Sequence, residues 1–394
     1  MKKNMMYAAA LAMGLAFAAT SCSNSDEPQA VNPADLEYSA QNANSWHNYM
    51  GVVAKLLEKD SNTLYSDWSE DYNASGRSYA EIFKAHDGEG YTSAISCIEQ
   101  ILDGCWDIAN EVGGAKIGDP YNLYKAGKTT EALYAVESWY SWHSREDYSN
   151  NIISIQNAYY GTRNMGAGID DGTIHANSIA ALVKANNAAL HQKVDAAIKA
   201  AWTAILNIPS PFRNNIGSAE TVEAMEACAA LAGVLRDDSE NLKSYLSTNF
   251  GAQDAVLSPI VSQYVDAVVL PTYKDLKEKN AALRQSIETL ASNRTDENFK
   301  AACEAWLVAR EPWEESEAFL FGPVANKGLD PNMDSWPLDQ EAIVNILNSG
   351  KFDDLDWSGD YSEGDQGIAD KQSVRGFHTL EFLLFKDGKA RSVN

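Results

Sequence analysis

The 394-residue chain is short of positive charge and of cysteine. It has 31 lysine and arginine residues against 55 aspartate and glutamate residues, and five cysteines. A protein this acidic repels phosphate backbones, which excludes nucleic acid as a natural partner. Cations are the ligands that such a surface attracts.

Four cysteines follow Cys22, at Cys97, Cys105, Cys228 and Cys303. None has the CxxC spacing of structural zinc or iron–sulfur sites, and four cysteines allow three disulfide pairings that sequence does not rank. Cys97 and Cys105 lie eight residues apart on one predicted helix, about 12 Å of rise, which is too far for a bond between them.

The usual catalytic motifs are absent as well. There is no HExxH, the pattern in which a helix presents two zinc ligands and a glutamate base, and no GxSxG elbow for a nucleophilic serine. We therefore assign no catalytic residue.

A long apolar run occurs at the N-terminus. Lys2 and Lys3 precede the apolar residues 5–19, which have the length of a signal peptide. The small residues before Cys22 are similar to a bacterial lipobox, and a polar tether follows. We expect a signal peptide at 1–21, lipidation of Cys22, a tether at 22–34 and an outer-membrane lipoprotein on the periplasmic or outer surface. No later stretch is expected to cross a membrane.

The rest of the chain reads as helix. Apolar residues recur at helical spacing, for example at Leu283, Ile287 and Leu290, and alternation bounded by hairpin turns is missing, so no sheet is expected. Long helices with short connections predict an all-α fold of two antiparallel bundles packed together. The pattern breaks near 248–258, which suggests domains at 35–250 and 255–394. Ala201-Trp202 leading to Pro211-Phe212 echoes Ala305-Trp306 leading to Pro312-Trp313, and a duplication would explain this.

The most informative segment is Gly376-Phe377-His378-Thr379-Leu380-Glu381, which continues with apolar residues to Phe385. As a helix it is apolar on all sides and therefore buried, with His378 and Glu381 on one face. A buried imidazole and carboxylate need partners. A metal ion would satisfy both, and so would an internal ion pair or hydrogen-bond network.

This segment resembles the GxHxxE signature of the imelysin family, which is grouped with metallopeptidases. Two further segments resemble marked elements of the family: Ala305 to Pro323, which contains Ala309-Arg310-Glu311-Pro312-Trp313-Glu314, and Asp334-Ser335-Trp336-Pro337-Leu338-Asp339. Segments at 105–120 and 137–155 resemble the half that normally follows GxHxxE. The resemblance thus implies a circularly permuted member, with the usual C-terminal bundle placed first.

The resemblance implies a site between the bundles, around the His378 helix. The expected metal ligands are His378, Glu381, Glu137 and Glu314, and the expected lining residues are Gly376, Arg310, Asp147, Asp334 and Trp336. Arg310 would neutralise a carboxylate, although its i,i+4 spacing to Glu314 equally fits an ordinary helix ion pair. Trp306, Trp313 and Trp336 fit core positions better than ligand platforms. His143 and Glu146 form a second HxxE that the family pattern does not require.

Three functions compete. The favoured hypothesis is an envelope lipoprotein that binds iron or another divalent metal and takes part in its uptake, with a transporter or surface protein as a further partner. Nitrogen and oxygen ligands suit iron, zinc or copper. The second is a metallopeptidase, for which the sequence offers no second histidine. The third is a polysaccharide- or protein-binding module, compatible with the ten tryptophans.

Overall fold

The computed structural model describes residues 36–88, 90–166, 168–352 and 354–393, and these are helical almost throughout. The predicted signal peptide, Cys22 and tether therefore lie outside the described residues. The α-helices are α1 (Ala43–Ser69), α2 (Tyr79–Ala85), α3 (Ala94–Glu111), α4 (Gly118–Lys125), α5 (Thr129–Ala135), α6 (Ser144–Tyr160), α7 (Ile179–Asn186), α8 (Ala188–Asn207), α9 (Ala219–Ala232), α10 (Leu242–Phe250), α11 (Asp254–Tyr264), α12 (Leu270–Ser292), α13 (Asp296–Glu314), α14 (Pro323–Asn326), α15 (Leu329–Asp334), α16 (Gln340–Ser349), α17 (Gln366–Gln372) and α18 (Gly376–Leu384).

Short π and 3-10 segments interrupt or extend these helices. The π segments are η4 (Val112–Lys116), η7 (Gly233–Asp237) and η8 (Val265–Val269), and the 3-10 turns are η5 (Ile169–Asp171), η6 (Phe212–Asn214) and η9 (Glu317–Phe319). The all-α prediction is confirmed.

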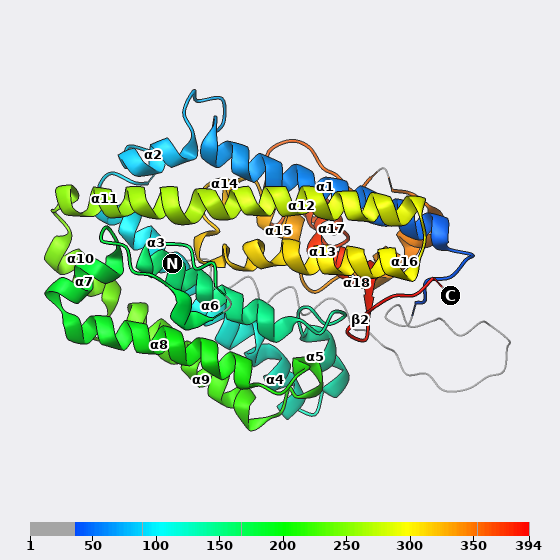
Figure 1. Ribbon diagram of the computed structural model, residues 1–394, viewed down its shortest axis with the longest axis horizontal. Helices are drawn as coiled ribbons and strands as arrows, with labels where there is room; N and C mark the ends of the chain where they lie inside the picture. The colour runs from blue at the N-terminus through cyan, green and yellow to red at the C-terminus, as the bar shows by residue number, and fades with distance from the viewer. Residues whose placement is uncertain (1–35, 89, 167, 353, 394) are drawn as a thin grey trace. The chain divides into compact units, whose positions relative to one another are not determined.

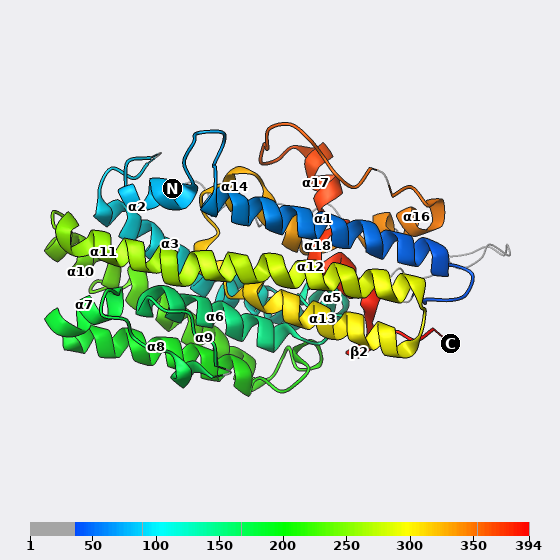
Figure 2. The same ribbon diagram turned by 45° about the horizontal axis from the view of Figure 1, so that its top comes forward.

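One group of helices is built on α1, α12 and α13, which run alongside one another (Figures 1 and 2). Leu283, Ile287 and Leu290 of α12 are fully buried, as their spacing predicts. A short connection joins α12 to α13, where the Thr295 hydroxyl caps the new helix by accepting from the Asn298 amide at 3.2 Å. The short helices α15 and α18 pack against α1.

The second group is built on α3, α6, α8 and α9 (Figure 1). It meets the first group where α6 packs against α13 and where α3 packs against η9. Residues 37–394 form one unit. A helix break occurs between Phe250 and Asp254, although α11 continues through Pro259. The division into two domains near this point and the internal duplication stay predictions.

The expectation of no sheet is wrong at the C-terminus. Strands β1 (Phe385–Lys386) and β2 (Lys389–Ala390) pair antiparallel directly after α18. Asp387 and Gly388 between them both have positive φ, at 50° and 72°. Asp-Gly is the dipeptide that such a two-residue turn prefers, so the signal was present in the sequence but very short.

The continuous helical stretch Asp254–Ser292 is long and apolar enough to cross a membrane by length and composition, contrary to the sequence expectation. Its most apolar window is 44% buried inside the protein, and α12 packs against α1 and α13. A core helix of a folded protein also meets these criteria of length and composition. The four cysteines of the described residues are buried free thiols, so none of the three disulfide pairings is formed.

Candidate metal-binding site

The site begins with a close approach between α18 and α15. Gly376, the first residue of α18, has φ +87°, and a Cβ built on it would lie 2.4 Å from the Met333 carbonyl oxygen. Only glycine tolerates both conditions at low cost. The contact places Asp334, at the end of α15, beside His378 on the first turn of α18.

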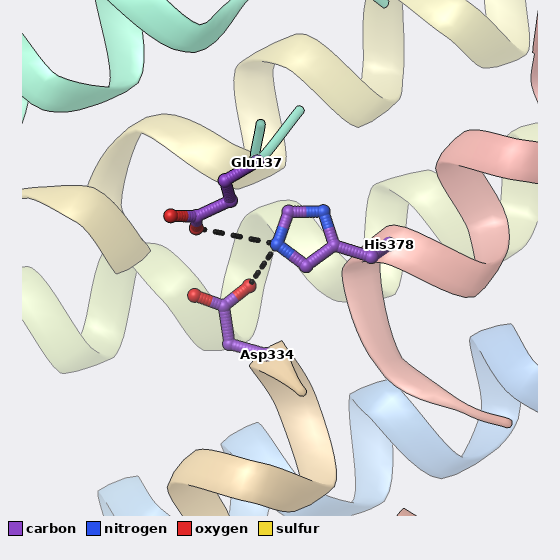
Figure 3. Close-up of side chains that lie close together, drawn as sticks. All are labelled: Glu137, Asp334 and His378. Carbon is purple, nitrogen blue, oxygen red and sulfur yellow. Dashed lines mark hydrogen bonds and ion pairs between the residues drawn. The ribbon is translucent and has the colours of Figure 1, made fainter. Parts of the chain in front are cut away.

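His378 is fully buried and uses both ring nitrogens. Nε2 lies 3.3 Å from Glu137 Oε1 and 3.2 Å from Asp334 Oδ1 (Figure 3). Nδ1 lies 3.0 Å from Glu381 Oε2, one turn later in the same helix. A carboxylate only accepts hydrogen bonds, so Nδ1 carries the proton and donates it to Glu381. Nε2 is then the nitrogen that faces Glu137 and Asp334.

The Glu381 carboxylate accepts hydrogen bonds from the loop that precedes α6. Its Oε1 accepts from the Tyr140 amide at 3.0 Å, the Ser141 amide at 2.8 Å and the Ser141 hydroxyl at 2.7 Å. Both carboxylate oxygens are therefore engaged on the side of the ring away from Nε2. The sequence predicts Glu381 as a metal ligand, and in the structure both of its oxygens are engaged by His378, Tyr140 and Ser141.

Two buried cations, Arg310 and Lys116, pair with these carboxylates. Arg310 Nη2 is 2.8 Å from Glu137 Oε1, and Nη1 bonds Asp334 Oδ1. Lys116 Nζ is 3.0 Å from Glu137 Oε2 and 3.7 Å from Glu317 Oε1. The indole of Trp313 donates to Asp334 Oδ2 at 2.7 Å.

The remaining predicted residues surround this centre. Glu314 Oε1 is 2.5 Å from Arg310 Nη2, and Asn151 Nδ2 donates to Glu314 Oε2 at 2.6 Å. Asp147 Oδ1 lies 2.7 Å from His143 Nδ1. The Trp336 ring stands edge-on to His378, with 4.9 Å between the ring centroids.

The charged side chains of the site shift one another's pKa values strongly. Burial opposes the charged form of Glu137, but the Lys116 ammonium and a hydrogen bond from His378 outweigh it and lower the pKa of Glu137. Burial and Arg310 oppose the charging of His378, but Asp334 and Glu137 outweigh them and hold the pKa of His378 well above 6.5. Burial raises the pKa of Glu314 to about 8. The described carboxylates in and around the site outnumber Lys116 and Arg310, so the cluster favours the uptake of further positive charge.

The geometry fits a metal ion. One donor atom from each of Glu137, Asp334 and His378 lies within 4.8 Å of the other two. In a tetrahedral site with ligand distances near 2.1 Å, neighbouring ligand atoms are about 3.4 Å apart. The distances of 3.2 and 3.3 Å from His378 Nε2 match this spacing. A hydrogen-bonded carboxylate on the far ring nitrogen is the usual support of a metal-bound histidine.

Comparison with known proteins identifies the chain. A family model described as Imelysin matches residues 26–237 and 269–394. This chain belongs to the imelysin family. The imelysin-like fold is shown independently by the crystal structure of an imelysin peptidase from Bacteroides ovatus. That structure is 58% identical with a TM-score of 0.87, over 92% of this chain and 100% of the other.

A shorter similarity links this imelysin-family chain to Iron-regulated protein A of Synechococcus elongatus. The two are 31% identical over 134 residues, which are 34% of this chain. The match spans about a third of the length of that relative, 33%. The circular permutation inferred from the order of the motifs stays a prediction.

The structure brings all the predicted site residues of this imelysin-family chain into one region, but at different distances from His378. His378, Glu137 and Asp334 converge; Glu381 and Glu314 lie one contact further out. The pair His143 and Glu146 does not form, because His143 bonds Asp147 and Glu146 bonds Arg145.

Sequence reasoning missed Lys116 and Glu317 as site residues. Both stand inside segments that resemble the family, but nothing in their spacing marks them. Trp306 and Trp313 are fully buried, as expected of core residues, whereas Trp336 lines the site.

Proposed function

We propose that this imelysin-family protein binds one transition-metal ion through His378 Nε2, Glu137 and Asp334, and that it takes part in iron or other metal uptake. The observation that carries the proposal is the convergence of these three donors from separate elements at metal-ligand spacing. One imidazole and two carboxylates suit iron or zinc. Three protein ligands leave coordination positions for water or for a chelating group on the cargo.

Iron is the first candidate among the metals. The curated relative carries the name Iron-regulated protein A, which is a statement about that protein and a reason to test iron here. An envelope location fits the same role. The signal region, the small residues before Cys22 and the polar tether support a lipid anchor in the outer membrane, from which the protein would pass metal to an uptake partner.

A metallopeptidase is the weaker alternative, although the similar crystal structure is described as a peptidase. The side chain of His378 has no exposed surface, and those of Glu137 and Asp334 are only 7% and 4% exposed. An ion can reach donors this deep more readily than a peptide backbone can. A metallopeptidase would also need a general base, and the nearby carboxylate of Glu314 is engaged by Arg310 and Asn151. These features favour binding over hydrolysis.

The test is metal titration of the chelator-stripped mature protein with Fe²⁺, Zn²⁺ and Cu²⁺, followed by elemental analysis. We expect one bound ion, and at least tenfold weaker binding in His378→Ala and in Glu137→Gln, which is about 1.4 kcal/mol. His86→Asn is the matched control, since His86 lies outside the site with φ 41°, a conformation that asparagine tolerates. Equal affinity in all four proteins would refute the proposal.

The anchor is tested separately. Cys22→Ser should release the protein from the membrane fraction and abolish labelling by a fatty acid. A variant that still pellets with membranes and still incorporates the label would exclude Cys22 as the lipidated residue.

A further inference from the structure

Arg310 contacts the same three atoms that would hold the metal ion. Its Nη2 lies 2.8 Å from Glu137 Oε1 and 3.3 Å from His378 Nε2, and its Nη1 bonds Asp334 Oδ1. These are the donor atoms that face one another in the candidate site. A metal ion and the guanidinium, both positive, cannot occupy that position together.

Arg310 also contacts two carboxylates that do not belong to the three candidate metal ligands. Glu314 Oε1 is 2.5 Å from Nη2, and Asp147 Oδ2 is 3.6 Å from Nε. Neither Arg310 Nε nor Glu314 Oε1 makes a hydrogen bond of good geometry, so both retain capacity. Both carboxylates are fixed by other groups, Glu314 by Asn151 and Asp147 by His143. A small movement away from Glu137 and Asp334 would therefore leave the guanidinium paired with Glu314 and Asp147.

We propose that Arg310 is an internal competitor that sets the metal affinity of the site, an inference that rests on the proposed function. In the metal-free protein the guanidinium neutralises Glu137 and Asp334. When an ion binds, the guanidinium withdraws onto Glu314 and Asp147, so one cation replaces another in a buried cluster. The exchange keeps the affinity below what the three donors alone would give. A protein that passes its metal on needs such a limit, because the returning guanidinium assists release.

Substitutions at Arg310 and Glu314, one helical turn apart, should change the metal affinity in opposite directions. Arg310→Met removes the competitor and should tighten binding of Zn²⁺ or Mn²⁺ at least tenfold. Glu314→Gln removes the carboxyl group that receives the displaced guanidinium and should weaken binding at least threefold. A purely structural role would move both affinities in the same direction. Lys300→Met is the control: Lys300 is a cation of the same helix with a 74% exposed side chain, and its loss should leave affinity unchanged.

The measurement is competition against a chromophoric chelator, with circular dichroism to verify folding. If Arg310→Met fails to fold, the metal affinity of Glu314→Gln tests the inference by itself. An unchanged affinity in Glu314→Gln overturns it. If His378→Ala abolishes binding but Arg310→Met binds as tightly as the wild type or more weakly, Arg310 has no competing role. The proposed metal site would still stand. Absence of binding in the wild type and in Arg310→Met alike would remove both proposals. Binding in Arg310→Met alone would support the competing role of Arg310 and overturn the proposed function of the wild-type protein.

Discussion

His378 Nδ1 and Glu381 Oε2 lie 3.0 Å apart on a single turn of a fully buried helix. The second oxygen of the same carboxylate takes three donors from Tyr140 and Ser141. The rotation of the ring is thereby fixed by a residue that does not itself face Glu137 and Asp334. In the proposed function, Glu381 acts through the histidine.

Glu381→Ala should therefore weaken metal binding by about 10- to 100-fold, the usual effect of losing the outer partner of a metal-bound histidine. Glu381→Gln keeps an acceptor for the Nδ1 proton and should lose less. Isothermal titration of the two variants beside the wild type provides the measurement. If alanine and glutamine variants bind as tightly as the wild type, Glu381 has no orienting role.

Gly376→Ala should destabilise the protein and disturb the site together. The added Cβ would meet the Met333 carbonyl at 2.4 Å, and φ of +87° is unfavourable for any residue with a side chain. We expect a loss of about 1–3 kcal/mol or more in the free energy of unfolding. Gly51→Ala in α1 is the control, since nothing lies within 4 Å of the new methyl group and alanine favours helix. Equal unfolding midpoints for both variants would contradict the close approach of α15 and α18.

Trp306→Ala should cost about 3–5 kcal/mol of stability, as large aromatic truncations in a core do. Trp306 is fully buried against Phe377 and Phe385, and its indole nitrogen donates to the Phe377 carbonyl at 2.9 Å. Val308, on the same helix, is 50% exposed, and Val308→Ala should change stability by less than about 0.5 kcal/mol. Denaturant unfolding of both variants makes the comparison, and similar costs would argue against this orientation of α13.

Acid should destabilise the protein in part through His47. Burial, with a smaller contribution from Arg294, lowers the pKa of His47 from 6.5 to about 4. The folded state thus disfavours the protonated ring. The associated stability is complete above pH 6.5 and is lost as the pH falls toward 4. His47→Gln should lose less unfolding free energy than the wild type between pH 7.5 and 4.5, measured by urea titration. Identical losses would show that His47 does not titrate with this shift.

The sequence predicts the all-α fold and the burial of the His378 helix well, because both depend on local pattern. Helical spacing identified α12, and the apolar surroundings of His378 predicted a buried helix. The role of Glu381 could not be predicted in this way. The imidazole nitrogen that the Glu381 carboxylate reaches depends on how the backbone amides of Tyr140 and Ser141 hold that carboxylate. These residues precede Glu381 by 241 and 240 positions in the chain.

Lys116 and Glu317 escaped prediction for a related reason. Their ion pair forms because η4 and η9 both pack against α3 and α6, and this tertiary arrangement leaves no periodicity or short motif in the sequence. The β-turn at Asp387 and Gly388 is different. The Asp-Gly turn signal is present in the sequence, but strands of two residues are too short to show an alternation of apolar and polar residues.

Glu137 and His378 are separated by 241 positions in the chain. A polypeptide is made from its N-terminus, so Glu137 leaves the ribosome long before His378 does. The nascent chain consequently lacks the assembled cluster of Glu137, Asp334 and His378, and it gains this cluster only when α18 packs in place. Under the proposed function, an unfinished chain would therefore hold no complete metal site.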